Sequence, residues 1–221
     1  LGNSALFNVK SNLDSEQDLL VFNRTENTRS LKVSSVFDPQ LSAEPFGLIS
    51  SVIYNVERLK KYFPSSLQMA WTGWGHLSVI ESACINQSSI SVKSIPESLI
   101  FIQETSHDLE KTRETVKRNY HHSFFGMPIL INFLFSSDSI KRRLYMNNWL
   151  KANWYKISFF SRSTAKRKTG AKFGTNIWIE VKAREAVSEI GLKGRILFFL
   201  GQFIKWENLS RFKFPNRLRK L

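Results

Sequence analysis

The chain has 221 residues, of which 42% are hydrophobic and 23% are charged, and its formal net charge is +14. These values are ordinary for a globular protein, so they exclude a wholly disordered chain, and the length suffices for one domain with a buried core. Cys84 is the only cysteine, which excludes an intramolecular disulfide and a metal site built from cysteines. The longest apolar runs, residues 129–135 and 196–201, fall far short of the roughly 20 residues that a membrane-spanning helix requires.

The first half of the chain combines strand patterns with one helical pattern. Residues 44–64 place apolar side chains at helical spacing, with Pro45 at the start and Pro64 as the stop, which predicts a helix. Two extended runs flank Gly73 and Gly75, which indicates a hairpin. The expected elements, besides that helix, are strands over 18–25, 31–37, 89–95 and 98–103, a hairpin over 66–83, and a mostly solvated helix over 103–120.

The second half is predicted to be rich in strands. Residues 174–183 alternate Ile177, Ile179 and Val181 with more polar neighbours, which is typical of a half-buried strand. Capping residues before residue 139 predict a helix over 137–154. Further strands are expected over 127–135, 156–160 and 194–206.

Together these elements predict an α+β fold, with a mostly antiparallel sheet packed with two or three helices. We expect a single domain over residues 1–221, made of a neutral-to-acidic half, 1–110, and a strongly basic half, 111–221. A basic loop, 161–174, is expected to protrude between two strands, and a basic tail to cover residues 207–221.

The sequence offers no motif with a catalytic mechanism behind its spacing. It has no phosphate-binding loop, dinucleotide fingerprint, nucleophile elbow or HExxH motif. Glu104 and His107 have the spacing of a carboxylate-bridged metal motif, but such sites need several ligands on facing helices. Cys84 lies in an apolar context that favours a small core residue over a nucleophile. We therefore predict no enzyme, no catalytic residue, no metal and no cofactor.

Basic residues are concentrated in the second half. Residues 1–110 contain 8 Lys and Arg against 12 Asp and Glu, whereas residues 111–221 contain 24 against 6. Charge concentrated in this way is typical of a polyanion-binding face, on which cations contact phosphates. The predicted RNA or phosphate contacts are Lys141, Arg142, Arg143, Lys151, Lys156, Arg162, Lys166, Arg167, Lys168, Lys172, Arg211, Lys213, Arg217, Arg219 and Lys220.

Two of these basic segments leave an alternative open. The loop 161–174 carries five cations and no carboxylate, and a solvated loop kept polar for solubility is the alternative to phosphate binding. Aromatic residues beside the first cluster are candidates for stacking on unpaired bases, although a merely amphipathic helix would show the same pattern. These candidates are Tyr145, Trp149, Trp154 and Tyr155.

A compact α+β core with basic loops and tails and no active site resembles a lineage-specific ribosomal protein of an organelle. We therefore expect a non-enzymatic structural component of a large ribonucleoprotein, with RNA, above all ribosomal RNA, and neighbouring proteins as partners. The chain begins at Leu1 rather than Met, so we expect trimming or processing. Removal of a presequence would place such a protein inside the cell, in the mitochondrial matrix.

A second interpretation follows from element order. The succession of "LKVSSVF", "FGLISSVIYNVERLKKYF" and "LQMAWTGWGHLSVI" resembles the strand, helix and hairpin of rhabdovirus matrix proteins, and "GTNIWIEVKAREAVSEIGLKGRILFF" resembles their last paired strands. This resemblance implies a self-associating viral structural protein in the virion, with basic clusters on anionic membrane and nucleocapsid. A nucleic-acid-processing enzyme is the third alternative, but it would need clustered carboxylates for metal ions.

Overall fold

The computed structural model describes residues 16–22, 29–38, 52–95, 123–157 and 173–203. The chain divides into two compact units, residues 1–108 (unit 1) and 109–221 (unit 2). The change from acidic to basic composition near residue 110 therefore falls at the division between the units. The single domain expected from the sequence stays a prediction.

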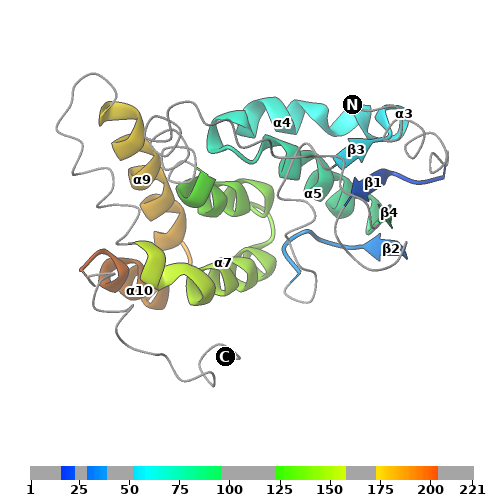
Figure 1. Cartoon of the computed structure of the whole chain (residues 1–221). Helices are drawn as coiled ribbons and strands as arrows, with labels where there is room; N and C mark the ends of the chain where they lie inside the picture. The colour runs from blue at the N-terminus through cyan, green and yellow to red at the C-terminus, as the bar shows by residue number, and fades with distance from the viewer. Residues whose placement is uncertain (1–15, 23–28, 39–51, 96–122, 158–172, 204–221) are drawn as a thin grey trace, which may run out of the picture. The chain divides into compact units, whose positions relative to one another are not determined.

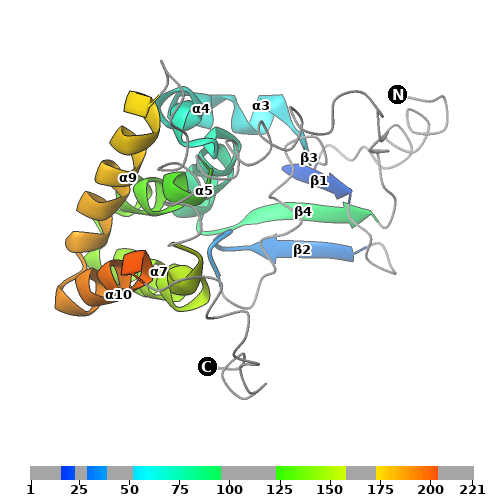
Figure 2. The ribbon, with the colours of Figure 1, turned by 60° about the vertical axis from the view of Figure 1, so that its left-hand side comes forward.

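Unit 1 contains a four-stranded sheet of β1 (Leu19–Phe22), β2 (Arg29–Val33), β3 (Val52–Tyr54) and β4 (Ile90–Ile95), in the order β2-β4-β1-β3. Figure 2 shows β1, β4 and β2 side by side. Two of the three pairings are antiparallel, and β1 with β4 is parallel. The prediction of an α+β fold with a mostly antiparallel sheet is confirmed. Strands were correctly expected within 18–25 and 89–95, whereas the strand expected over 31–37 is β2, which begins at 29 and ends at 33.

The centre of this sheet is apolar on both faces. All four residues of β1 are buried, as expected for a strand with a neighbour on each side. Leu20, Phe22 and Ile95 form one buried cluster, and Ile53 of β3 packs against it. The helix α5 (Gly75–Gln87) contacts β4, and Cys84 of α5 is buried with its Sγ 3.4 Å from the Val33 carbonyl oxygen.

Two buried carboxylates accept hydrogen bonds that stabilise this core. Asp18 accepts a hydrogen bond from the backbone N–H of Ser91 at 2.7 Å and another from Arg58 Nε at 2.6 Å. The hydrogen bond and the charge of Asp18 raise the pKa of the Arg58 guanidinium. Glu81 of α5 accepts from the backbone N–H of Val36 at 2.8 Å. Asp18 thus joins the start of β1 to β4 and to Arg58, and Glu81 joins α5 to the segment after β2, through charge-assisted hydrogen bonds.

The helix expected over residues 44–64 is wrong in its boundaries. Residues 52–54 form β3, followed by α3 (Val56–Leu59), a 3-10 turn η2 (Lys60–Tyr62) and α4 (Phe63–Met69). Pro64 lies in the first turn of α4 instead of stopping a helix, because the first turn needs no backbone N–H donor. Residues 44–51 and Pro45 lie outside the described part of the chain.

The hairpin expected over residues 66–83 is also wrong. This segment contains the end of α4, a 3-10 turn η3 (Ala70–Thr72) and most of α5. Gly73 has a φ of 80° and ends η3, so it terminates a helical turn instead of linking two strands. Nine residues all round α5 are buried, so the segment lacks the one-sided periodicity that marks a surface helix. The matrix-protein resemblance rests in part on this hairpin, which is not formed.

The described part of unit 2 is helical throughout. Residues 123–134 form a helix, followed by α7 (Ser139–Asn153), a 3-10 turn η4 (Trp154–Lys156), α9 (Phe173–Ser188) and α10 (Leu192–Phe203) (Figure 1). The helix expected over 137–154 is confirmed, and Asp138 caps it by accepting from the backbone N–H of Lys141 at 3.0 Å. The core includes Phe125, whose ring meets that of Phe198 of α10 edge to face at 6.2 Å.

The strands expected in unit 2 are wrong wherever the structure describes them. Residues 127–134, 156–157, 174–183 and 194–203 are all helical or in the 3-10 turn. In α9 the buried residues Ile179, Ala183 and Ala186 recur every three or four positions, which is the helical period. With these helices, the fold contains more than the two or three expected. The expected strand 98–103 and helix 103–120 lie outside the described residues.

Candidate nucleic-acid interface

The helix α7 buries two apolar residues and exposes three cations. Met146 and Leu150 are completely buried, one helical turn apart. Lys141, Arg143 and Lys151 are exposed on the remaining surface. Met146 and Leu150 are spaced by four and therefore share one face, while Ile140 and Leu144 are exposed on the same helix as the cations.

The three exposed cations are weakly neutralised. Lys141 Nζ lies 3.9 Å from a carboxylate oxygen of Asp138, at the outer limit of an ion pair, and its side chain is 56% exposed. Arg143 and Lys151 form no ion pair with any residue that the structure describes. The described part of unit 2 carries nine Lys and Arg against four Asp and Glu. This part of α7 therefore presents unneutralised positive charge to solvent.

Arg142, the fourth predicted contact, is held inside unit 2. Its Nη1 lies 3.2 Å from a carboxylate oxygen of Glu189 and 3.4 Å from the side-chain oxygen of Asn132, and its side chain is only 20% exposed. Asn132 also donates to Glu189 at 3.4 Å. These three side chains link the helix over 123–134, α7 and the connection between α9 and α10. Arg142 is thus the least available of these cations. Lys156, the fifth, is half-buried in η4.

The candidate stacking residues are partly used for packing. Tyr145 lies with its ring centroid 5.0 Å from that of Phe135, and Trp149 lies 5.1 Å from Phe124. Trp154 is half-buried, and the side chain of Tyr155 lies outside the described residues. Tyr145 and Trp149 each have one ring face against another aromatic residue, which favours the amphipathic-helix alternative for these two. Base stacking by these residues stays a prediction.

Most of the remaining predicted contacts fall outside the described residues. These are the loop cations Arg162, Lys166, Arg167, Lys168 and Lys172 and the tail cations Arg211, Lys213, Arg217, Arg219 and Lys220, as well as Glu104 and His107. The expectation that the loop 161–174 joins two strands is wrong, because residues 154–157 and 173–174 at its two ends are helical. A β-hairpin therefore cannot be the support of this loop.

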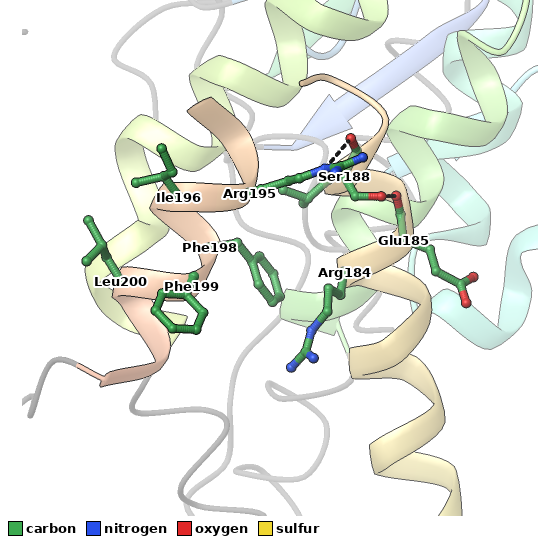
Figure 3. Close-up of a pocket in the computed structure, with 9 residues that line it drawn as sticks. Arg184, Glu185, Ser188, Arg195, Ile196, Phe198, Phe199 and Leu200 are labelled. Atoms are coloured by element: carbon green, nitrogen blue, oxygen red, sulfur yellow. Dashed lines mark hydrogen bonds between the residues drawn. The ribbon is translucent and has the colours of Figure 1, made fainter. Parts of the chain in front are cut away.

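The structure also contains a groove that the sequence interpretation missed. A cavity of about 650 Å³ lies between α9 and α10, lined mainly by apolar side chains of α10 and by Arg184, Val187 and Arg195. In Figure 3, Phe198 points into the space between the two helices, while Ile196 and Leu200 lie on the outer side of α10. The sequence contains a signal for this groove, namely the helical spacing of Ile196, Phe199 and Leu200. The run was instead interpreted as a buried strand.

Chemical groups that would indicate catalysis do not gather in the described residues. No cluster of three or more His, Cys, Asp or Glu side chains there could hold a metal ion. Burial raises the pKa of the Cys84 thiol, so this thiol is poorly suited to act as a nucleophile. Within the same part of the chain, no helix combines the length and the apolar character needed to traverse a bilayer.

Comparison of the chain with protein-family models, with curated proteins and with solved structures finds no match. The functional argument therefore rests on the geometry and charge of the residues described above.

Proposed function

We propose that unit 2 binds RNA through its phosphates, and that the protein is a non-enzymatic structural component of a ribonucleoprotein assembly of the organellar-ribosomal type. The observation that supports the proposal is that Lys141, Arg143 and Lys151 of α7 are exposed without strong neutralisation.

The arrangement of these cations fits a polyanion better than a single phosphate group. Lys141 and Lys151 are ten residues apart, which is about 15 Å along a helix. A single phosphate cannot contact cations spread over that length, whereas a nucleic-acid backbone carries charges all along it. RNA is the proposed nucleic acid because Tyr145, Trp149 and Trp154, although used in part for packing, remain partly exposed beside the cations, and exposed aromatic residues stack on the unpaired bases of RNA loops.

Binding of this kind carries little sequence information. Phosphate contacts position a protein on nucleic acid, while base contacts provide specificity. The basic loop 161–174 and the tail 207–221 add ten further cations from the list of predicted contacts, so we assign them to the same RNA surface. The acidic composition of residues 1–110 leaves unit 1 for neighbouring proteins of the assembly.

The test compares two triple variants of the full chain. In the first, Lys141, Arg143 and Lys151 are replaced by alanine. In the second, Lys32, Lys60 and Lys61 of unit 1, which are also exposed, are replaced by alanine. Both variants lose three positive charges, so a difference between them reports the position of the charge and not the net charge.

Affinity for several unrelated RNAs is measured by fluorescence anisotropy over a series of salt concentrations. Loss of three phosphate contacts should flatten the salt slope by about 2 on single strands, so a fourfold rise in salt weakens the wild type about 20-fold more than the α7 variant. The loss should be similar for all RNAs, and the unit 1 variant should keep the wild-type slope. Equal slopes for the wild type and the α7 variant would overturn the assignment of this surface.

The loop is tested in the same assay. Replacement of Lys166, Arg167 and Lys168 by alanine should lower the affinity by a similar factor for unrelated RNAs and flatten the slope by up to about 0.9 per lost contact on duplex. An unchanged slope would remove the loop from the proposed surface.

A further inference from the structure

The helix α10 packs against the rest of unit 2 along a narrow strip. Gly194, Phe198 and Gly201 are its buried positions, and they are three or four residues apart. Gly201 lies so close to η4 that a Cβ atom there would collide with the Trp154 carbonyl oxygen. The strip is therefore built for close approach of two backbones, and it leaves most of the circumference of α10 uncovered.

The uncovered side of α10 is strongly apolar. Leu192 is 73% exposed and Phe199 is 59% exposed, and Ile196 and Leu200 are nearly half exposed. These four residues are spaced by one to four positions so that they share one face of the helix. When leucine, isoleucine and phenylalanine side chains are this exposed, the protein does not gain the stabilising free energy that their burial would provide. This apolar face, defined by Leu192, Ile196, Phe199 and Leu200, is thus suited to a partner.

Cations border the apolar face on both sides. Lys193 and Arg195 are exposed, and helical geometry places them roughly 80° to either side of the centre of the face. Arg195 donates through Nε to the Ser188 carbonyl oxygen at 3.2 Å, an acceptor that leaves its positive charge uncompensated. No Asp or Glu occurs between residues 192 and 203. The groove toward α9 is lined by both Arg184 and Glu185, so it adds no net charge beside the face (Figure 3).

We propose that the apolar face of α10 docks on an anionic lipid bilayer and lies along its surface. Helices of this type place Phe and Leu side chains at the boundary between headgroups and acyl chains, while flanking Lys and Arg contact anionic headgroups. The twelve residues of α10 are about 18 Å long, shorter than the roughly 30 Å of a hydrocarbon core, so the helix lies on the bilayer. The site is separate from the α7 cations, and the inference does not depend on RNA binding.

Charge argues against the other occupants. A second copy on this face would add another Lys193 and Arg195 to the interface, and α10 has no carboxylate to neutralise them. The chain segments 158–172 and 204–221 on either side of α9 and α10 carry eleven Lys and Arg against one Glu, so they too would repel the face. RNA would neutralise the cations but leave Leu192 and Phe199 in water. An anionic bilayer satisfies both the charge and the apolar surface.

The experiment measures sedimentation of the full chain with vesicles of phosphatidylcholine alone and with vesicles that also contain phosphatidylserine. The wild type should bind the anionic vesicles, and added salt should weaken the binding. Replacing Lys193 and Arg195 by glutamine should reduce the affinity about 30-fold, from the usual contribution of two basic residues near an anionic surface. Replacing Phe199 and Leu200 by serine should reduce it on the order of tenfold or more.

A matched control replaces Leu67 and Ile85 of unit 1, which are also exposed, by serine and should leave the vesicle affinity unchanged. All the substituted side chains are at the surface, and circular dichroism confirms that the variants are folded. Equal binding of the wild type to neutral and anionic vesicles would overturn the proposal, as would wild-type binding by the Phe199 and Leu200 variant.

Two further measurements decide between the bilayer and its competitors. Sedimentation equilibrium of the wild type and of the Phe199 and Leu200 variant shows whether the face joins two copies, and a dimer lost only in the variant would overturn the proposal. The same variant should keep wild-type affinity for RNA in the anisotropy assay. Loss of RNA affinity there would assign the face to RNA and also overturn it.

Discussion

Replacing Gly201 by alanine should destabilise unit 2, although alanine is the better helix former. A Cβ atom at this position would collide with the Trp154 carbonyl oxygen and lie 3.1 Å from Cβ of Ile157. Both neighbours belong to the segment of η4 that α10 packs against, and the backbone oxygen cannot rotate away. The helix α10 must therefore shift outward to accept the methyl group.

Two opposing effects set the size of the change. Overpacking of a close contact costs about 1–3 kcal/mol, and alanine regains up to about 1 kcal/mol over glycine in a helix. The net expectation is a loss of about 1–2 kcal/mol in the free energy of unfolding. For a chain of this size that loss corresponds to a fall of about 2–8 °C in the melting temperature.

Gly194 provides the matched control on the same helix. A Cβ atom there would lie 2.7 Å from Cγ1 and Cδ1 of Ile190, which can rotate away, and 3.1 Å from the Val187 carbonyl oxygen, a much milder backbone contact than the one at Gly201. An altered rotamer costs about 0.5–1.5 kcal/mol, which the higher helix propensity of alanine largely offsets. Gly194→Ala should therefore remain within about 1 kcal/mol of the wild type.

Urea unfolding followed by circular dichroism measures both variants against the wild type. The informative quantity is the difference between them, because both gain the same propensity term. If Gly201→Ala proves as stable as Gly194→Ala, then α10 does not approach η4 closely, and the explanation of its narrow buried strip is wrong.

Three further predictions concern unit 1. Asp18→Ala removes the partner of Arg58 and of the Ser91 N–H, and urea unfolding should show a loss of about 2–3 kcal/mol. A loss below about 0.5 kcal/mol, which is typical of exposed ion pairs, would show that Asp18 does not stabilise the core as argued. Burial raises the pKa of Tyr54 to about 12, so the folded state holds a proton that the unfolded state releases above its ordinary pKa of about 10. Stability should then fall as pH rises from about 10 to 12, and Tyr54→Phe should reduce that fall; an identical pH dependence in the variant would refute this cause. Because burial raises the pKa of the Cys84 thiol, Ellman's reagent should react with it at neutral pH only after unfolding, and rapid reaction of the folded chain would contradict the burial.

The sequence predicted the sheet of unit 1 better than its helices. β1, β2 and β4 were found because short apolar runs end at turn residues, and these strands pair as the pattern requires. The segment of α5 was misinterpreted because buried residues surround the whole helix, as in Leu77 and Val79, which are both buried on nearly opposite sides. A helix buried on all sides has no polar face, so periodicity cannot distinguish it from a buried strand.

In unit 2 the misinterpretation has a different cause. Ile177, Ile179 and Val181 alternate locally, but tertiary packing selects Ile179 and Ala183 as the buried pair and leaves Val181 exposed. For α10, the run was interpreted as a buried strand, whereas it is a helix whose Gly201 allows close approach to η4. The exposed cations of α7 could be predicted because charge and capping are local properties. The ion pair between Arg142 and Glu189 could not be predicted, because 47 positions separate the two residues in the sequence.

The position of β4 in the sheet also governs the order in which unit 1 can form during synthesis. Among the described strands, β2 pairs only with β4, and β4 lies between β2 and β1. The ribosome completes β2 at residue 33 but does not reach β4 until residue 90, so β2 waits roughly 3–11 s for its neighbour. Throughout that interval β2 has both hydrogen-bonding edges open, which is the condition for association with other nascent chains. We therefore expect this protein to need chaperones mainly before residue 95 has emerged from the ribosome.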